Sequence, residues 1–296
     1  MSTAPDKGPT GVVVKTPLLF AILLIVDSLH FVFARALLPH LPAEMSSFLV
    51  LAIAAMQVGF FQLIRGQLDI HAFRDHWRFY TIIGVLVAAS TVLNYAAVEF
   101  VDPGTASLLG KTSVVFSLML GVFWLRERLR PIEVAGAVLA LVGAFIISFQ
   151  PGDLLRFGSV MVLASTFFYA LHTAIVKRHG EGIEFGDFFL FRIASIAIFL
   201  FLFATVRRQL VWPTPIAWLL VFVAGTVDVV ISRSLFYLSL RRMPMSIHTI
   251  ILTLSPVVTI GWSLLLFGQF PTALGLIGGA LVILGVFLAT RRRPRR

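Results

Sequence analysis

Long apolar stretches recur along the whole chain, and they constrain the fold more than any other feature of the sequence. A helix needs about 20 apolar residues to cross the hydrocarbon core of a bilayer. Ten stretches approach or exceed this length, and linkers with Pro, Gly or charged residues separate them. They lie at 17–36, 44–65, 77–101, 103–124, 131–149, 157–178, 185–206, 214–240, 244–267 and 271–290. The sequence therefore predicts an all-α integral membrane protein with ten transmembrane helices.

The composition supports a lipid environment and argues against nucleic acid as a partner. Only 13% of the residues are charged, whereas soluble proteins carry about 25%. The net charge of +10 comes from short arginine runs between apolar segments, which is typical of membrane-protein loops. The chain has no cysteine, so it has neither disulfides nor thiolate metal ligands. We expect the lipid bilayer as its surroundings, and no metal or cofactor.

The distribution of Lys and Arg predicts the orientation in the membrane. With the N-terminus in the cytoplasm, cytoplasmic segments hold 17 of the 24 basic residues, the opposite side holds 4, and 3 lie inside spans. Cytoplasmic loops carry the excess of Lys and Arg in membrane proteins. We therefore expect a multi-pass protein of the cell's inner membrane with both termini in the cytoplasm.

The second half of the sequence resembles the first at a shift of about 142 residues. Leu29-His30 matches Leu171-His172, and Arg65 matches Arg207. Each half holds five spans, an odd number, so the second half must enter the membrane upside down. Inverted repeats of this kind place substrate sites near the midplane between the halves and permit alternating access. The expected divisions are a cytoplasmic tail 1–16, a first repeat 17–150, a second repeat 157–290 and a basic cytoplasmic tail 291–296.

Turns and glycines in both halves carry a family resemblance. Residues 125–129 read LRERL and precede Gly136 and Gly143, while residues 267–271 read FGQFP and precede a glycine-rich last span. With Arg192 near the start of its span, this pattern resembles the EamA-type transporters of the drug/metabolite transporter superfamily. The resemblance implies a ten-helix transporter, not an enzyme, that works as an exporter.

The chain also departs from the pattern of that family at three positions. Gln269 replaces a glutamate, Val50 occupies the position that matches Arg192, and Lys111 stands where many members have an apolar residue. Lys111-Thr112 is similar to a lysine followed by hydroxyl residues in nucleotide-sugar transporters of the same superfamily, where the lysine contacts a substrate phosphate.

Polar and ionisable side chains within the spans are the candidate functional residues, because such groups are costly in lipid. Asp27, Lys111 and Asp228 fall near mid-membrane. Helical spacing gathers small and polar residues on faces of several spans, which predicts one polar cavity between the halves. The candidates for substrate binding or ion coupling are Lys111, Asp27, Asp228, Arg233, His30, His172, Asn94, Tyr95, Tyr169, His248 and Ser255.

Each of these residues also has a purely structural interpretation. Lys111 can form an ion pair with Asp27 or Asp228 without touching a substrate. His30 and His172 can serve as hydrogen bonders between helices, and we assign Arg192 to ordering the cytoplasmic end of its helix. Pro256 follows Ser255 and predicts a bend, which is a candidate gating hinge.

These observations predict a secondary transporter that moves a small polar metabolite by alternating access. The charges within the spans sum to +1 with neutral histidines, which favours an anionic or zwitterionic solute. The sequence holds no ATP-binding loop, so a gradient or exchange must drive transport. The alternatives are an exchanger of phosphate-bearing solutes and a membrane enzyme that acts on a lipid-linked substrate. The protein is expected to be a monomer or a homodimer.

Overall fold

A computed structural model describes residues 16–124, 130–148, 157–179, 183–236, 252 and 254–290. The two tails, the turn at 125–129 and His248 therefore lie outside the described residues. Helices form the regular structure of the described part, which contains no strand.

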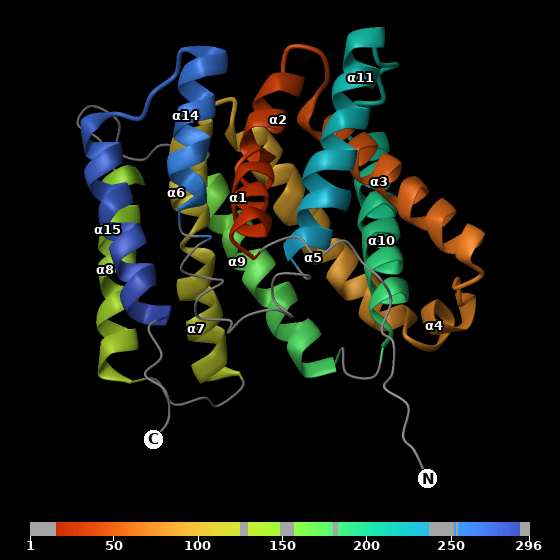
Figure 1. Ribbon diagram of the computed structural model, residues 1–296, viewed down its shortest axis with the longest axis horizontal. Helices are drawn as coiled ribbons and strands as arrows, with labels where there is room; N and C mark the ends of the chain where they lie inside the picture. The colour runs from red at the N-terminus through yellow and green to blue at the C-terminus, as the bar shows by residue number, and fades with distance from the viewer. Residues whose placement is uncertain are drawn as a thin grey trace.

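The helices of the first repeat are α1 (Thr16–Asp27), α2 (His30–Leu37), α3 (Ala43–Arg65), α4 (Ile70–Asp75), α5 (Trp77–Ala97), α6 (Pro103–Gly110), α7 (Ser113–Phe123) and α8 (Pro131–Ser148). The spans of this repeat stand side by side and run in alternating directions, with α1 and α2 forming one span and α6 and α7 another (Figure 1).

The helices of the second repeat run opposite to their counterparts in the first. They are α9 (Phe157–His179), α10 (Phe185–Val206), α11 (Pro215–Ala224) with the π-helix η1 (Gly225–Ile231), α14 (Ser255–Phe267) and α15 (Ala273–Thr290). In Figure 1, α3 descends while α10 rises, and α8 rises while α15 descends. The two halves thus form an inverted pair.

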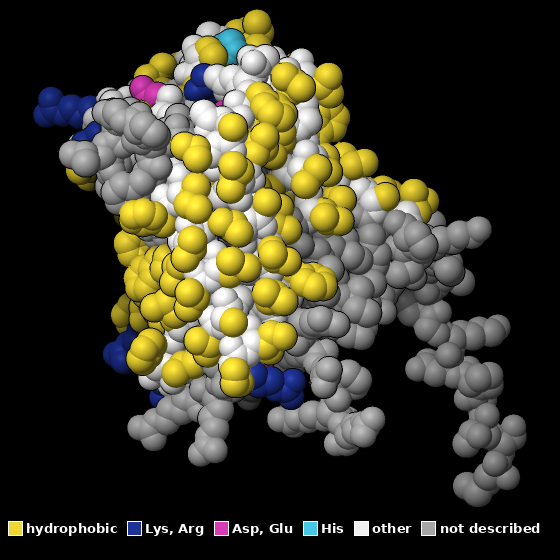
Figure 2. Space-filling model, turned by 90° about the vertical axis from the view of Figure 1, so that its left-hand side faces the viewer, with side chains coloured by type: hydrophobic (Ala, Val, Ile, Leu, Met, Phe, Trp, Pro, Cys, Tyr) yellow, Lys and Arg dark blue, Asp and Glu magenta, His cyan; other side chains and the backbone are white. Residues whose placement is uncertain are grey.

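The outer surface of the protein matches a lipid environment. Among the described residues, six helical segments are long and apolar enough to cross a membrane, and three further apolar helices are shorter. Figure 2 shows one side of the molecule, where hydrophobic side chains cover the middle and Lys and Arg lie toward its upper and lower ends. Apolar side chains such as Phe145 and Leu284 are 60% and 49% exposed on α8 and α15. Such broad apolar exposure suits a bilayer and would be a liability in water.

Two of the expected continuous spans are interrupted, which corrects the sequence-based boundaries. The first span breaks at Ser28-Leu29, between α1 and α2, and the fourth breaks at Lys111-Thr112, between α6 and α7. At the second break the N–H groups of Lys111 and Thr112 bond to carbonyls three residues back. The chain therefore tightens for one turn there, as in a 3₁₀-helix. The eighth span changes into a π-helix around Asp228.

The start of α7 has a counterpart in the second repeat. Helix α7 begins at Ser113, and α14 begins at Ser255, 142 residues later, after the turn residue Leu254. Pro256 lies in the first turn of α14, where its missing N–H costs no hydrogen bond. The expected bend at Pro256 is thus the start of a helical segment.

The linker after α3 contains a short helix that the sequence analysis did not predict. Gly66 ends α3 with a left-handed φ of 62°, a conformation that glycine adopts without strain. The Asp69 carboxylate then accepts a hydrogen bond from the His71 N–H and caps α4. Six residues are too few for a clear helical pattern in the sequence. The N-cap residue Asp69 was therefore the only sequence signal that could have indicated this helix.

Helices α8 and α15, the last of each repeat, pack backbone against backbone. A methyl group added at Gly136 would lie 2.5 Å from the Ala289 nitrogen, and one added at Gly278 would lie 2.6 Å from the Gly143 oxygen. Small residues permit such close approach between membrane helices. The glycines of these two spans therefore pair the ends of the two repeats within one chain.

Replacing Gly143 by Ala is expected to lower thermal stability, because the added methyl would collide with the backbone of α15 at Gly278 and Val282. Overpacking of this kind costs about 1–3 kcal/mol. Gly261→Ala is the matched control, since a methyl there meets nothing within 4 Å. Thermal unfolding of both purified variants in detergent checks the prediction. Equal midpoints for the two variants would contradict it.

Candidate functional site

A polar cavity of about 210 Å³ lies between the two repeats. The first repeat lines it from α1, α2, α5 and the α6–α7 break, and the second lines it from α9, α10, the π-helix η1 and α14. Its charged or titratable lining residues are Asp27, His30, Tyr95, Lys111, Tyr169, Arg192, Asp228 and Arg233. A site of this kind between inverted halves is typical of membrane transporters.

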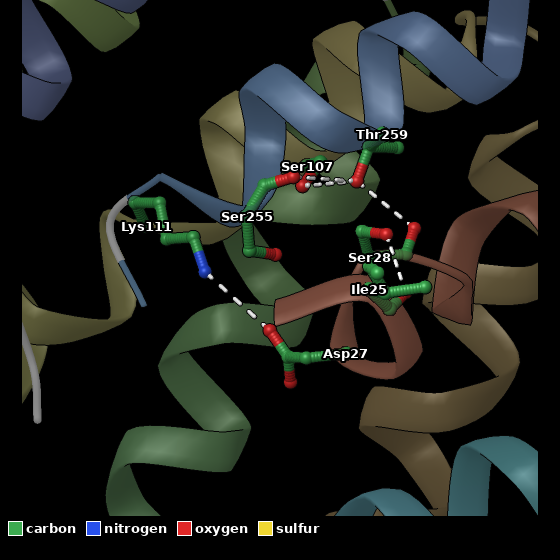
Figure 3. A network of polar contacts seen from close by, with 7 residues as sticks. All are labelled: Ile25, Asp27, Ser28, Ser107, Lys111, Ser255 and Thr259. Atoms are coloured by element: carbon green, nitrogen blue, oxygen red, sulfur yellow. Dashed lines mark hydrogen bonds and ion pairs between the residues drawn. The ribbon is translucent and has the colours of Figure 1, made fainter. Parts of the chain in front are cut away.

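Lys111 faces Asp27 across this cavity. Its Nζ lies 4.0 Å from Asp27 Oδ2, and the two side chains are 19% and 17% exposed. Figure 3 shows the ammonium and the carboxylate pointing toward each other from the α6–α7 break and the end of α1. A separation of 4.0 Å is too long for a direct hydrogen bond. The pair therefore balances charge and leaves each group able to take another partner.

His30 and Asp228 form a much tighter pair, which joins the two repeats. His30 Nδ1 lies 2.8 Å from Asp228 Oδ2, and the Asp228 side chain is only 4% exposed. The His30 ring packs edge-on against Tyr95 with centroids 6.0 Å apart. The buried Tyr95 hydroxyl and the buried Asn94 carbonyl oxygen make no hydrogen bond to any residue that the structure describes. Both atoms are therefore available to a bound molecule or to water.

The equivalent histidine of the second repeat has a different partner. Arg192 Nε donates a hydrogen bond of 3.2 Å to His172 Nε2, and both residues are buried. The His172 ring lies against Tyr169, with centroids 5.3 Å apart. Tyr169 lines the cavity and lies within electrostatic reach of Arg192 and Arg233. This side of the cavity is therefore cationic.

The break between α1 and α2 is held by side chains of α14 (Figure 3). Thr259 Oγ1 lies 2.9 Å from the Ser28 carbonyl oxygen and 3.3 Å from Ser107 Oγ. Trp262 Nε1 donates to Ser28 Oγ at 3.1 Å, and that hydroxyl donates to the Ile25 carbonyl at 2.6 Å. An interrupted helix survives in a membrane only where neighbours satisfy its backbone groups. Polar side chains from both repeats do so here.

The structure brings most of the sequence-based candidates to this cavity. Nine of them line it: Asp27, His30, Asn94, Tyr95, Lys111, Tyr169, Asp228, Arg233 and Ser255. His172 lies behind the lining, bonded to Arg192. His248 lies outside the described residues.

Arg192 is the residue that sequence reasoning missed. It was assigned to a helix end, yet it lines the cavity with 6% of its surface exposed. Its place in the second turn of α10 suggested the membrane surface, but the partner that draws it inward comes from α9. The hydroxyl pair Ser90–Ser165, 2.9 Å apart, was likewise missed as a contact between the repeats. An isolated serine gives no such signal in a sequence.

Thr259→Val is expected to lower the midpoint of thermal unfolding by several degrees. The change keeps the shape of the side chain but leaves the buried Ser28 carbonyl without its hydroxyl partner, a loss of about 1–3 kcal/mol. Thr205→Val is the control, because the exposed Thr205 hydroxyl bonds only within its own helix, to Phe201. If both variants melt at the same temperature, the hydroxyl of Thr259 does not stabilise the break.

Comparison with known proteins gives a consistent family match. Residues 15–149 match the EamA-like transporter family, and residues 156–291 match it a second time. A solved crystal structure has the same fold, with a TM-score of 0.66 over 93% of this chain and 96% of its own, at 19% identity.

Two curated relatives are similar over about two thirds of their own lengths. One is an uncharacterized transporter of Synechocystis sp., 22% identical over 73% of this chain and 66% of that protein. The other is named as a probable terminal-alkyne amino-acid exporter of Streptantibioticus cattleyicolor, 29% identical over 69% of each chain.

Proposed function

The chain belongs to the EamA-like transporter family, and on that premise we propose that it is a secondary transporter for a small zwitterionic metabolite. The single observation that carries this proposal is the cavity between the inverted repeats, whose lining holds charges of both signs. A zwitterion needs both a cationic and an anionic partner when it leaves water, because an unpaired charge is costly to bury.

The lining supports an amino acid as the class of substrate. Lys111 offers an ammonium to a carboxylate, and Asp228 offers a carboxylate to an amino group. Lining charges sum to +1, from Lys111, Arg192 and Arg233 against Asp27 and Asp228. One of the relatives is itself named as an amino-acid exporter. A zwitterion or an anion is therefore preferred to a cation.

The size of the cavity favours a small solute. Its volume of about 210 Å³ is below the roughly 300–1,000 Å³ that drug-sized ligands occupy. The position of Thr112 also counts against the alternative substrate class, phosphate-bearing solutes. Its hydroxyl bonds to the Leu109 carbonyl at 2.7 Å and lies 3.3 Å from Thr166, and Thr112 is fully buried. The Lys111-Thr112 pair therefore does not face a ligand together.

The arrangement of the breaks supports alternating access. The chain is interrupted at Ser28 and at Lys111, α14 begins at Ser255, and all three places lie beside the cavity. Half-helices that meet at a site can tilt separately while the site stays intact. Rocking of one repeat against the other would open the cavity to each side in turn. We assign the direction as export, by analogy with the family and with the named exporter.

The experiment that tests this function uses protein reconstituted into vesicles. Vesicles loaded with one unlabelled L-amino acid are diluted into a trace of the same labelled compound, for each standard amino acid in turn. A transporter exchanges the two, so transient accumulation of label is expected for at least one small amino acid. Absence of accumulation for all of them, while a sugar phosphate exchanges, would replace this substrate class with the phosphate-bearing one.

Lys111→Ala is expected to weaken amino-acid binding about 10- to 100-fold, because a hydrogen bond to a charged group contributes about 1.5–3 kcal/mol. Lys111→Arg keeps the charge and should retain part of the affinity. Asp27→Asn serves as the control for the ion pair, since it leaves the ammonium in place. Titration of purified protein with the exchanged amino acid gives the affinities. Equal affinity for wild type and Lys111→Ala would mean that Lys111 serves only the pair with Asp27.

We also propose that both termini face the cytoplasm, in the inner membrane. The chain has no cysteine, so single cysteines report position without background. Gln67→Cys follows α3, and Leu210→Cys follows α10 at the opposite end of the bundle (Figure 1). In intact cells, a membrane-impermeant maleimide should label Leu210→Cys and spare Gln67→Cys. The reverse pattern would invert the orientation.

A further inference from the structure

We propose that His30 and Asp228 form the proton-coupling site of this transporter, at which a proton and the amino group of the substrate compete for one carboxylate. The inference rests on the proposed function and adds the coupling ion to it. It identifies the transporter as a proton antiporter.

The geometry of the pair carries this inference. His30 Nδ1 and Asp228 Oδ2, both in the cavity lining, lie 2.8 Å apart, within hydrogen-bond distance. His30 belongs to α2 of the first repeat, and Asp228 belongs to η1 of the second. A movement of one repeat against the other therefore stretches this contact directly. Histidine is also the side chain whose charge changes in the physiological pH range.

The exchange of ions at this site balances in charge and in protons. In the proton-loaded state, the imidazolium of His30 donates its Nδ1–H to the Asp228 carboxylate. When a zwitterion enters, its ammonium donates hydrogen bonds to that carboxylate in place of His30. The imidazolium, left without its counter-ion beside cationic residues, releases one proton to water. One amino acid is bound for each proton released, so the two move in opposite directions.

The groups around the pair support this competition. Arg233, one turn beyond Asp228, and Lys111, at the α6–α7 break, are cationic and disfavour an unpaired imidazolium. The Asp27 carboxylate lies 4.0 Å from the Lys111 ammonium, so its negative charge is already balanced by Lys111. Tyr95 of α5 packs on the His30 ring.

The remaining elements add one more cation and no further carboxylate to the described lining. Arg192 of α10 and Tyr169 of α9 lie on the second-repeat side, while α3 and α14 contribute the uncharged Leu51 and Ser255. Helix α11 has no ionisable residue.

Asp228 also lies where the helix can move. Residues 225–231 form a π-helix, a rare form that occurs frequently at functional sites. Thr226 in the same segment accepts a hydrogen bond of 2.8 Å from Gln57 Nε2 of α3. The carboxylate is thus carried by a segment that is tied to the first repeat on two sides.

The repeat supplies a matched control. His172 is 142 residues after His30 and occupies the equivalent place in the second repeat. Its Nε2 accepts from the cationic Arg192, an arrangement that requires a neutral imidazole. Replacing His172 therefore removes a histidine of the same position and packing that carries no proton in this scheme.

The test compares His30→Gln, His172→Gln and wild type in vesicles. Glutamine keeps a hydrogen bond to the neighbouring side chain but does not titrate. Two measurements are made with the L-amino acid that wild type exchanges most strongly. One is exchange at equal pH on both sides, and the other is accumulation driven by a lumen at about pH 6 in a medium at about pH 7.5, across the range in which histidine titrates.

Wild type and His172→Gln should exchange and also accumulate the amino acid at least about fivefold above equilibrium. His30→Gln should lose the accumulation that the pH gradient drives, so that its accumulation relative to its own exchange at equal pH falls to the value measured without a gradient. Retained accumulation in His30→Gln would overturn the inference and leave the proposed function standing. Absence of exchange in wild type for every amino acid would overturn the proposed function and the inference with it. Exchange in His30→Gln also shows that this variant is folded.

Discussion

Water is missing from the hydrocarbon core of a bilayer, so each polar group placed there must find its partner inside the protein. This constraint organises the whole chain. An ammonium at mid-membrane costs at least about 2.5–3.5 kcal/mol, yet Lys111 lies there. It is tolerated because Asp27 balances its charge and because the two face a polar cavity. The same requirement brings Thr259 and Trp262 to the interrupted backbone at Ser28. The breaks and the charges therefore depend on one another.

The two repeats share one helical scaffold, but their equivalent residues have different partners. The segments α7 and α14 begin at equivalent positions, and His30 and His172 occupy equivalent sites. Their partners differ in charge, since one histidine meets a carboxylate and the other meets a guanidinium. A symmetric frame can therefore hold an asymmetric site, with a histidine–carboxylate pair on one side and a histidine–guanidinium pair on the other. Glycine packing between α8 and α15 joins the last helices of the two repeats within the chain.

The cavity between the repeats also explains why the chain tolerates irregular helices. A straight helix of uniform apolar residues would be more stable in lipid, but it could not present backbone and side-chain groups to a solute. The π-helix around Asp228 and the tight turn at Lys111 place ionisable side chains at the cavity. Irregular helical hydrogen bonding thus lies beside the cavity, and neighbouring helices of the other repeat bond to these segments.

The sequence by itself determined the membrane environment, the repeat and most of the charged or titratable cavity-lining residues, including Lys111, Asp27 and Asp228. These features follow from length, hydropathy and the high cost of charge in lipid, all of which are local properties. Only the tertiary structure decided which charge meets which. Lys111 pairs with Asp27 rather than Asp228, and Arg192 turns inward to His172 instead of ordering a helix end. The breaks at Ser28 and Lys111 were also beyond the sequence, because the groups that stabilise them come from helices far away along the chain.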